Sequence, residues 1–86
     1  MDMKKEYKKE VLKLFGKRLK ELRLERELSL RDFARECDVD NSKISKIESG
    51  KIDIRFYTII ELAAGLKVHP MELFNFDHEW KDEAFM

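Results

Sequence analysis

The chain has 86 residues, 42% of them charged and 10% aromatic, and its formal net charge at pH 7 is zero. This length allows one small domain around one hydrophobic core and leaves no room for a separate catalytic domain. The single cysteine excludes an internal disulfide. Without an apolar signal segment or an apolar run that could span a bilayer, the expected location is the cytoplasm.

The charges are distributed unevenly along the chain. Residues 1–26 carry ten Lys/Arg against five Asp/Glu, residues 27–55 six against seven, and residues 56–86 two against six. Zero net charge is not typical of a nucleic-acid-binding protein. A basic N-terminal part and an acidic C-terminal part can nevertheless orient a molecule on a polyanion. An ordinary solvated surface is the alternative, and charge alone does not decide between them.

Residues 3–27 predict an amphipathic first helix, with Gly16 as the candidate point of interruption. Its apolar residues recur at steps of three to four: Met3, Tyr7, Val11, Phe15, Leu19 and Leu22. Lysines cover the remaining surface: Lys4, Lys5, Lys8, Lys9, Lys13, Lys17 and Lys20. We interpret them as a solvated face rather than a dedicated row of phosphate contacts.

Residues 30–37 predict a second, shorter helix. Ser29 is its expected N-cap, and Asp32 stands at N3, where a carboxylate can reach back to the cap. Phe33 and Ala34 are expected to face inward. Cys37 is interpreted as a small buried apolar residue rather than a nucleophile. Asp38 follows at a position where a left-handed backbone conformation is expected, which Asp tolerates less well than Gly.

Residues 41–48 predict a third helix with one apolar and one polar face. Asp40 is its expected N-cap and Gly50 its expected stop. Ile44 and Ile47 share one face, whereas hydroxyl, amide and ammonium groups cover the other. Such a helix is suited to the DNA major groove, although a polar surface helix is the alternative for this segment alone. Two short helices joined by a tight turn predict a helix-turn-helix unit.

Residues 56–66 predict the fourth helix, and Pro70 at N1 opens the last clear one, with Leu73 and Phe74 as its core contacts. The inward stripe expected for the fourth helix is Phe56, Ile59, Ile60, Ala63 and Leu66. Beyond Phe74 the residues Phe76, Trp80 and Ala84 are spaced by four, which suits either a further helical turn or an acidic, partly ordered tail.

The segments GKRLKELRLERELSLRDFA, VDNSKISKIESGK and TIIELAAGLKVHPMELF resemble the Cro and phage-repressor (XRE) family of helix-turn-helix DNA-binding proteins. The resemblance implies an all-α, compact five-helix, lambda-repressor-like domain whose helices 2 and 3 form the helix-turn-helix. It also implies a transcriptional regulator that binds double-stranded operator DNA as a homodimer. The expected type of regulator is a repressor. The expected organisation is a basic helical extension (1–11), the DNA-binding domain (12–74) and an acidic-aromatic tail (75–86).

The resemblance also implies roles for polar residues on and after the third helix. Asn41, Ser42 and Lys46 are the residues expected to read bases. Lys43 and Ser45 are expected to contact a base or a phosphate. Lys51 and Arg55 are expected to contact the DNA backbone or the minor groove. Lysine donates to guanine acceptors and asparagine pairs with adenine, so the chemistry suits these positions. A partly buried ion pair between Arg23 and Glu48, common in the family, is expected to support the fold.

Three positions depart from the family pattern. Leu30 stands where the second helix usually begins with a glutamine that contacts a phosphate, and Asp38 replaces the usual glycine of the turn. The Pro-Ser that commonly opens the fourth helix is Ile54-Arg55, which leaves Asp53 as the candidate cap. The lost glutamine weakens the DNA interpretation slightly, and none of the three changes threatens the fold.

Two other classes of function compete with DNA binding. An enzyme is not expected, since the chain lacks a phosphate-cradling glycine loop and its histidines do not stand at metal-ligand spacing with Cys37. No metal, cofactor or membrane is expected either. A protein-interaction module of the same fold, such as an antitoxin or adaptor, is the stronger rival. Zero net charge and Leu30 favour this module, whereas the polar third helix and Arg55 favour DNA.

The homodimer is expected to form through the fifth helix and the segment around Phe76 and Trp80. The N-terminal extension is a candidate for a further contribution. The reason is that these segments carry apolar residues outside the five-helix core, in a family whose operators are usually two-fold symmetric.

Overall fold

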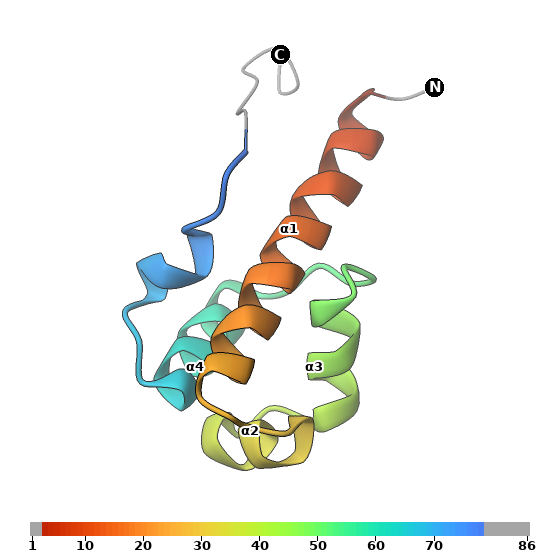
Figure 1. The fold of residues 1–86 in the computed structure, drawn as a ribbon. Coiled ribbons are helices and arrows are strands. Elements are labelled where there is room, and N and C mark those ends of the chain that lie inside the picture. The colour runs from red at the N-terminus through yellow and green to blue at the C-terminus, as the bar shows by residue number, and fades with distance from the viewer. Residues whose placement is uncertain (1–2, 79–86) are drawn as a thin grey trace.

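Four α-helices and one short 3-10 helix follow one another in the computed structural model, which describes residues 3–78 (Figure 1). They are α1 (Met3–Glu25), α2 (Leu30–Cys37), α3 (Asn41–Glu48), α4 (Phe56–Leu66) and η1 (Pro70–Phe74). The all-α class is therefore confirmed. The expected fifth α-helix is instead a 3-10 helix of five residues. A segment of five residues is too short for a stable α-helix, and such short segments commonly close with i→i+3 hydrogen bonds instead.

Helix α1 runs from Met3 to Glu25 without a break, so the expected interruption near Gly16 was wrong. Gly16 serves packing instead. A Cβ at this position would collide with the carbonyl oxygens of Ile47 and Glu48, which lie at the end of α3. The missing side chain lets two helices approach closely, while the neighbouring residues keep the helical hydrogen bonds intact.

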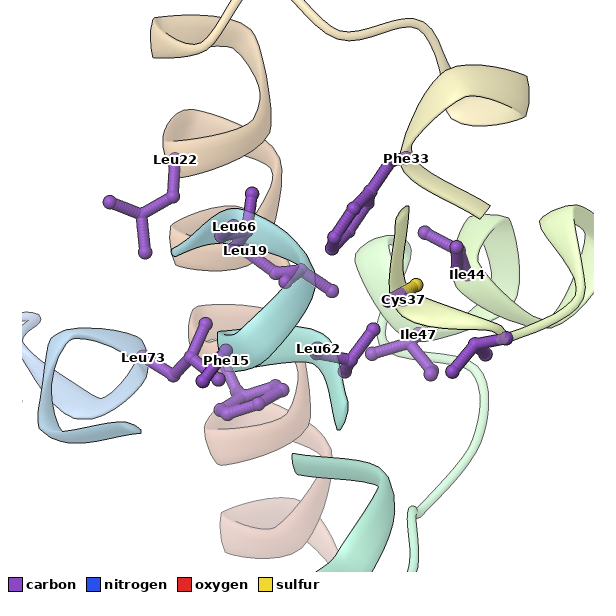
Figure 2. Close-up of a cluster of buried hydrophobic side chains, with 12 residues drawn as sticks. Phe15, Leu19, Leu22, Phe33, Cys37, Ile44, Ile47, Leu62, Leu66 and Leu73 are labelled. Carbon is purple, nitrogen blue, oxygen red and sulfur yellow. The ribbon is translucent and has the colours of Figure 1, made fainter. Parts of the chain in front are cut away.

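The hydrophobic core lies where α1, α2, α3, α4 and η1 meet (Figure 2). Its buried residues are Phe15, Leu19, Leu22, Phe33, Cys37, Val39, Ile44, Ile47, Leu62, Ala63, Leu66 and Leu73. Because every element contributes to this one cluster, none has an independent core. Gly65 lets α4 approach α2, since a Cβ there would lie 2.5 Å from the Cβ of Cys37.

Two aromatic residues expected in the core are exposed. Phe56, the first residue of α4, is 78% exposed, because the helix turns Thr58, Leu62 and Leu66 towards the core instead. Phe74 is half exposed. Leu73 fills the core position at the end of η1, and the ring of Phe74 lies against Phe15 with 5.5 Å between the ring centroids.

Two arginines, one on α1 and one just after it, hold the C-terminal elements in place. Arg18 Nε donates to the carbonyl oxygen of Glu72 at 2.8 Å, and its Nη2 lies 3.0 Å from the Glu72 carboxylate. Arg26 Nη1 donates to the carbonyl oxygen of Leu66 at 2.7 Å. The chain after η1 then runs back beside the N-terminal half of α1 (Figure 1), where His78 stacks edge-on against Tyr7.

Three helix ends use left-handed residues other than glycine: Glu27, Asp38 and Lys67, each at φ 57°. The expectation for Asp38 is thus confirmed. The start of α4 differs from the expectation, because Asp53 does not cap it. The Asp53 carboxylate accepts from the N–H of Ile54 and pairs with Lys8, whereas Arg55 occupies the N-cap without a side-chain hydrogen bond. Within the described residues, no helix is long and apolar enough to cross a membrane.

Candidate nucleic-acid interface

Helix α3 presents a polar face to solvent. The side chains of Ile44 and Ile47 are buried on its inner side. The residues exposed on its outer side are Asn41, Ser42, Ser45 and Lys46, and Lys43 is half buried at the margin. Five of the seven residues assigned to DNA contacts therefore lie on this one short helix. Amide, hydroxyl and ammonium groups are the donors and acceptors that match base edges and phosphate oxygens.

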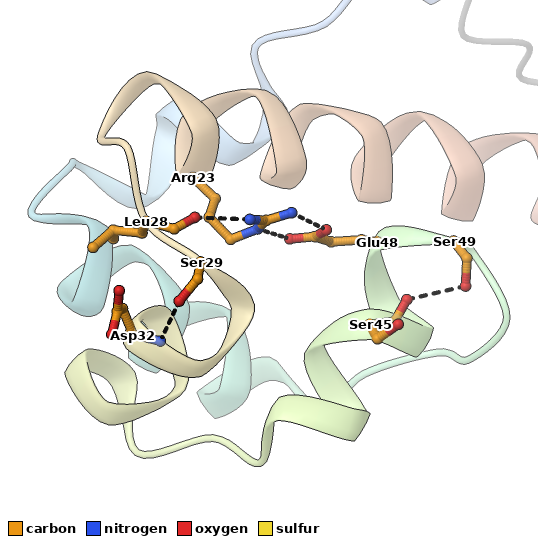
Figure 3. Close-up of polar contacts among 7 residues, drawn as sticks. All are labelled: Arg23, Leu28, Ser29, Asp32, Ser45, Glu48 and Ser49. Carbon is orange, nitrogen blue, oxygen red and sulfur yellow. Dashed lines mark hydrogen bonds and ion pairs between the residues drawn. The ribbon is translucent and has the colours of Figure 1, made fainter.

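Both ends of α3 are fixed by local hydrogen bonds. The Asp40 carboxylate accepts from the backbone N–H of Lys43 at 3.2 Å, as expected of an N-cap. At the other end Gly50, at φ 72°, donates to the carbonyl of Ile47, and Lys51 donates to the carbonyl of Lys46. These two bonds form a Schellman motif. Ser49 Oγ adds a bond to the carbonyl oxygen of Ser45 at 3.1 Å (Figure 3).

A bidentate ion pair joins α1 to the end of α3 (Figure 3). Arg23 Nε donates to Glu48 Oε2 at 2.7 Å and Nη2 to Oε1 at 3.0 Å, while Nη1 donates to the carbonyl oxygen of Leu28 at 2.8 Å. The two side chains are only 8% and 7% exposed. With so little water around it, the pair fixes the orientation of the polar helix through fork-to-fork geometry. The structure thus brings together the two residues expected to pair.

Two arginines of α2 were not assigned from the sequence but lie beside α3. Arg31 and Arg35 line an open hollow with the turn between α2 and α3 and with Asn41. Arg35 is well exposed and lies 3.7 Å from Asp32. They could have been found from the sequence, because their spacing of four residues places both on one face of α2.

Lys51 and Arg55, the residues assigned to backbone or minor-groove contacts, are exposed on the loop between α3 and α4 and at the start of α4. Lys51 lines a second open hollow with lysines of α1. This neighbourhood could not be predicted from local patterns, because about forty residues separate Lys51 from those lysines.

Cys37 is buried against Gly65 at the end of α2. Burial away from water raises the pKa of its thiol above the ordinary value of 9.0. The thiol therefore stays protonated at neutral pH and is a poor nucleophile. Among residues 3–78, no group of three or more His, Cys, Asp or Glu side chains is placed to hold a metal ion.

Residues 19–73 match the family model described as "Helix-turn-helix", HTH_3. The match covers more than half of the chain, and the protein therefore belongs to this family of XRE-type, DNA-binding transcription regulators. Over 62 residues the chain is 39% identical to the control protein C.MunI of a Mycoplasma species. This matched stretch covers 71% of this chain and 84% of that protein.

Solved structures of related proteins share the fold. The restriction-modification controller protein C.AhdI of Aeromonas hydrophila superposes with a TM-score of 0.72 at 36% identity, covering 73% of this chain and 96% of that one. An HTH_3 family transcriptional regulator of Vibrio cholerae superposes with a TM-score of 0.75 at 27% identity. The match covers 78% of this chain and 38% of that one. These relatives are regulators and controller proteins rather than enzymes, which agrees with the prediction from the sequence.

Proposed function

We propose that this protein is a sequence-specific transcription regulator of the restriction-modification controller type, which acts in the cytoplasm and represses from an operator that it binds as a homodimer. The observation that carries the proposal is the geometry of α3. Its outer face is polar and exposed, its inner face is locked by two isoleucines, and its end is held by the Arg23–Glu48 pair. The likeness to C.MunI and C.AhdI supports the choice of controller type.

The proposed contacts divide by chemistry. Asn41, Ser42 and Lys46 are exposed on α3 and read bases in the major groove. Ser45 is exposed and Lys43 half buried at the edge of the same face, and both contact a base or a phosphate. Arg55 and Lys51 flank the helix and contact the backbone or the minor groove. The first three carry the sequence information in this scheme, and the others position the helix.

The homodimer is proposed to form through η1 and the start of α4. Met71 on η1 is 68% exposed, and Phe56 and Tyr57 on α4 are 78% and 69% exposed. Large apolar side chains on the surface of a small domain are typical of an interface. Phe76, also expected at the interface, packs partly against the protein's own core. Trp80, the other residue expected at the interface, lies outside the described residues.

Selection of binding sites from random duplex DNA tests the proposed function. We expect the full chain to enrich one two-fold symmetric sequence whose half-sites lie about one helical turn, roughly 34 Å, apart. The enriched duplex should bind at least about 10³-fold more tightly than random duplex at physiological salt. Equal affinity for both duplexes would contradict sequence-specific regulation. No binding to any duplex at low salt would favour a protein-interaction module of the same fold.

A further inference from the structure

A basic hollow lies beside the end of α3, between the first turns of α1 and the loop that follows α3. We call it the lysine groove. It is lined by Lys5, Lys8, Lys9, Leu12, Lys13, Ser49, Gly50 and Lys51. Five of these eight residues carry a positive charge, although the chain as a whole has none in excess. The groove begins one residue beyond the end of α3.

The groove exists because the loop after α3 lies directly on α1. Gly50 is so close to α1 that a Cβ there would lie 2.8 Å from Lys13 Cγ and 2.9 Å from Lys13 Cα. Three residues further along α1, Gly16 meets the carbonyl oxygens at the end of α3. These two close approaches fix the lysines of α1 relative to the polar helix. The lysine groove is therefore a rigid neighbour of α3 and not a separate, loosely attached arm.

The lysines of the groove form a row. Lys5, Lys9 and Lys13 are four residues apart, so they lie on one face of α1 at steps of about 6 Å along its axis. Like charges at this spacing repel one another. A polyanion that lies along the row relieves the repulsion. Each DNA strand carries one negative charge per roughly 3.4 Å of helix axis, so the row is long enough to pass several phosphates.

Two carboxylates near the groove have partners within the protein, and one of these partners is a groove lysine. Asp53 pairs with Lys8 at 3.4 Å, and the Glu10 carboxylate lies 3.8 Å from His78 Nδ1 on another side of α1. Among residues 3–78, no carboxylate forms an ion pair with Lys9, Lys13 or Lys51. Three cations next to α3 are thus available to an external anion.

From this arrangement we infer that the lysine groove binds backbone phosphates of the DNA next to the stretch that α3 reads. Helix α1 then adds phosphate contacts to the base contacts that α3 makes. This inference rests on the proposed function and extends it to lysines of α1 for which the sequence predicts only a solvated face. Since every sequence carries the same phosphates, the groove strengthens binding to all DNA and leaves the choice of bases to α3.

A matched pair of double variants tests the groove. Lys9→Gln/Lys13→Gln removes two charges that line it, and Gln keeps much of the aliphatic stem that packs against Gly50. Lys17→Gln/Lys67→Gln removes two exposed charges outside the groove, so both variants have the same net charge. Affinity for the selected operator and for random duplex is measured between 50 and 200 mM salt (about the range over which counterion release is resolved), after circular dichroism has shown equal helix content.

For the groove variant we expect a loss of roughly tenfold or more on both duplexes and a salt slope lower by about 1.8, since each lost phosphate contact removes about 0.9. The base preference should be unchanged, and some of the phosphates whose ethylation weakens wild-type binding should no longer show this interference. The control variant should keep the wild-type slope. If the two variants behave alike while the wild type binds its operator, the groove inference fails and the proposed function stands. If the wild type binds no duplex, both fail.

Discussion

At the residue scale, the Arg23–Glu48 pair decides how firmly α3 is held. Both charges are almost withdrawn from water, and the three guanidinium hydrogen bonds satisfy the Glu48 carboxylate and the carbonyl oxygen of Leu28. A buried pair contributes little net stability over an apolar pair of the same size, but breaking it leaves an uncompensated charge. The pair is therefore expected to act mainly on the orientation of α3.

We predict that Glu48→Gln lowers the free energy of unfolding by about 3 kcal/mol, because Arg23 is then left charged and nearly buried. Urea denaturation measures the change. The exposed Asp32–Arg35 pair provides the control, and Asp32→Asn should cost less than about 1 kcal/mol since water screens that pair. Similar losses in the two variants would mean that the Arg23–Glu48 pair is as well hydrated as the surface pair.

At the element scale, the crossing of α1 and α3 depends on Gly16. Alanine is a better helix former than glycine by about 1 kcal/mol, so helix propensity alone favours Gly16→Ala. The collision of the new Cβ with two backbone carbonyl oxygens opposes it, and backbone cannot move aside as a flexible side chain can. Overpacking of this kind typically costs about 1–3 kcal/mol, which exceeds the gain in propensity.

We therefore predict that Gly16→Ala destabilises the fold by about 2 kcal/mol. Its neighbour Lys17 is exposed on the same helix, and Lys17→Ala should leave the stability within about 0.5 kcal/mol of wild type. Thermal melts of both variants provide the comparison. A stabilised Gly16→Ala protein would show that α1 and α3 can separate at little cost, and the rigid placement of the lysine groove would then be lost.

A second prediction at this scale separates reading from positioning on and beside α3. Lys46→Ala should cost about 1–3 kcal/mol on the preferred operator and relax the choice of base at one position, since base edges differ between sequences. Lys51→Ala should weaken binding to the preferred operator and to random DNA alike, because phosphates are the same in every sequence. It should also lower the salt slope of log affinity by about 0.9. Equal losses on both duplexes for Lys46→Ala would assign it to the backbone and leave base reading to Asn41 and Ser42.

At the scale of the whole molecule, the proposed two-fold operator would require two copies of α3 at a fixed separation. We predict that wild type sediments as a dimer at tens of micromolar, and that Met71→Lys shifts it towards monomer, because η1 carries this exposed apolar side chain. Leu24, 53% exposed on α1, supplies the control Leu24→Lys. A monomeric wild type that still binds its operator at full affinity would refute the dimer.

Much of the fold could be predicted from the sequence because its signals are local. Apolar residues at helical spacing placed the helices, and Ser29 and Asp40 marked the starts of α2 and α3 through hydrogen bonds that span three residues. The polar face of α3 followed from helical geometry alone. The XRE-type resemblance, confirmed by the family match, rested on the same local segments.

Only the tertiary structure decided which residues meet across the chain. The sequence predicted an inward Phe56 and a break at Gly16, but the rotation of α4 on the core and the crossing of α1 over α3 depend on all the packed elements at once. The lysine groove joins residues about forty positions apart, so no periodicity within one helix could reveal it. Local hydrogen bonding and hydrophobic spacing determine the elements of this protein, whereas close packing between distant segments determines which charged side chains lie beside α3.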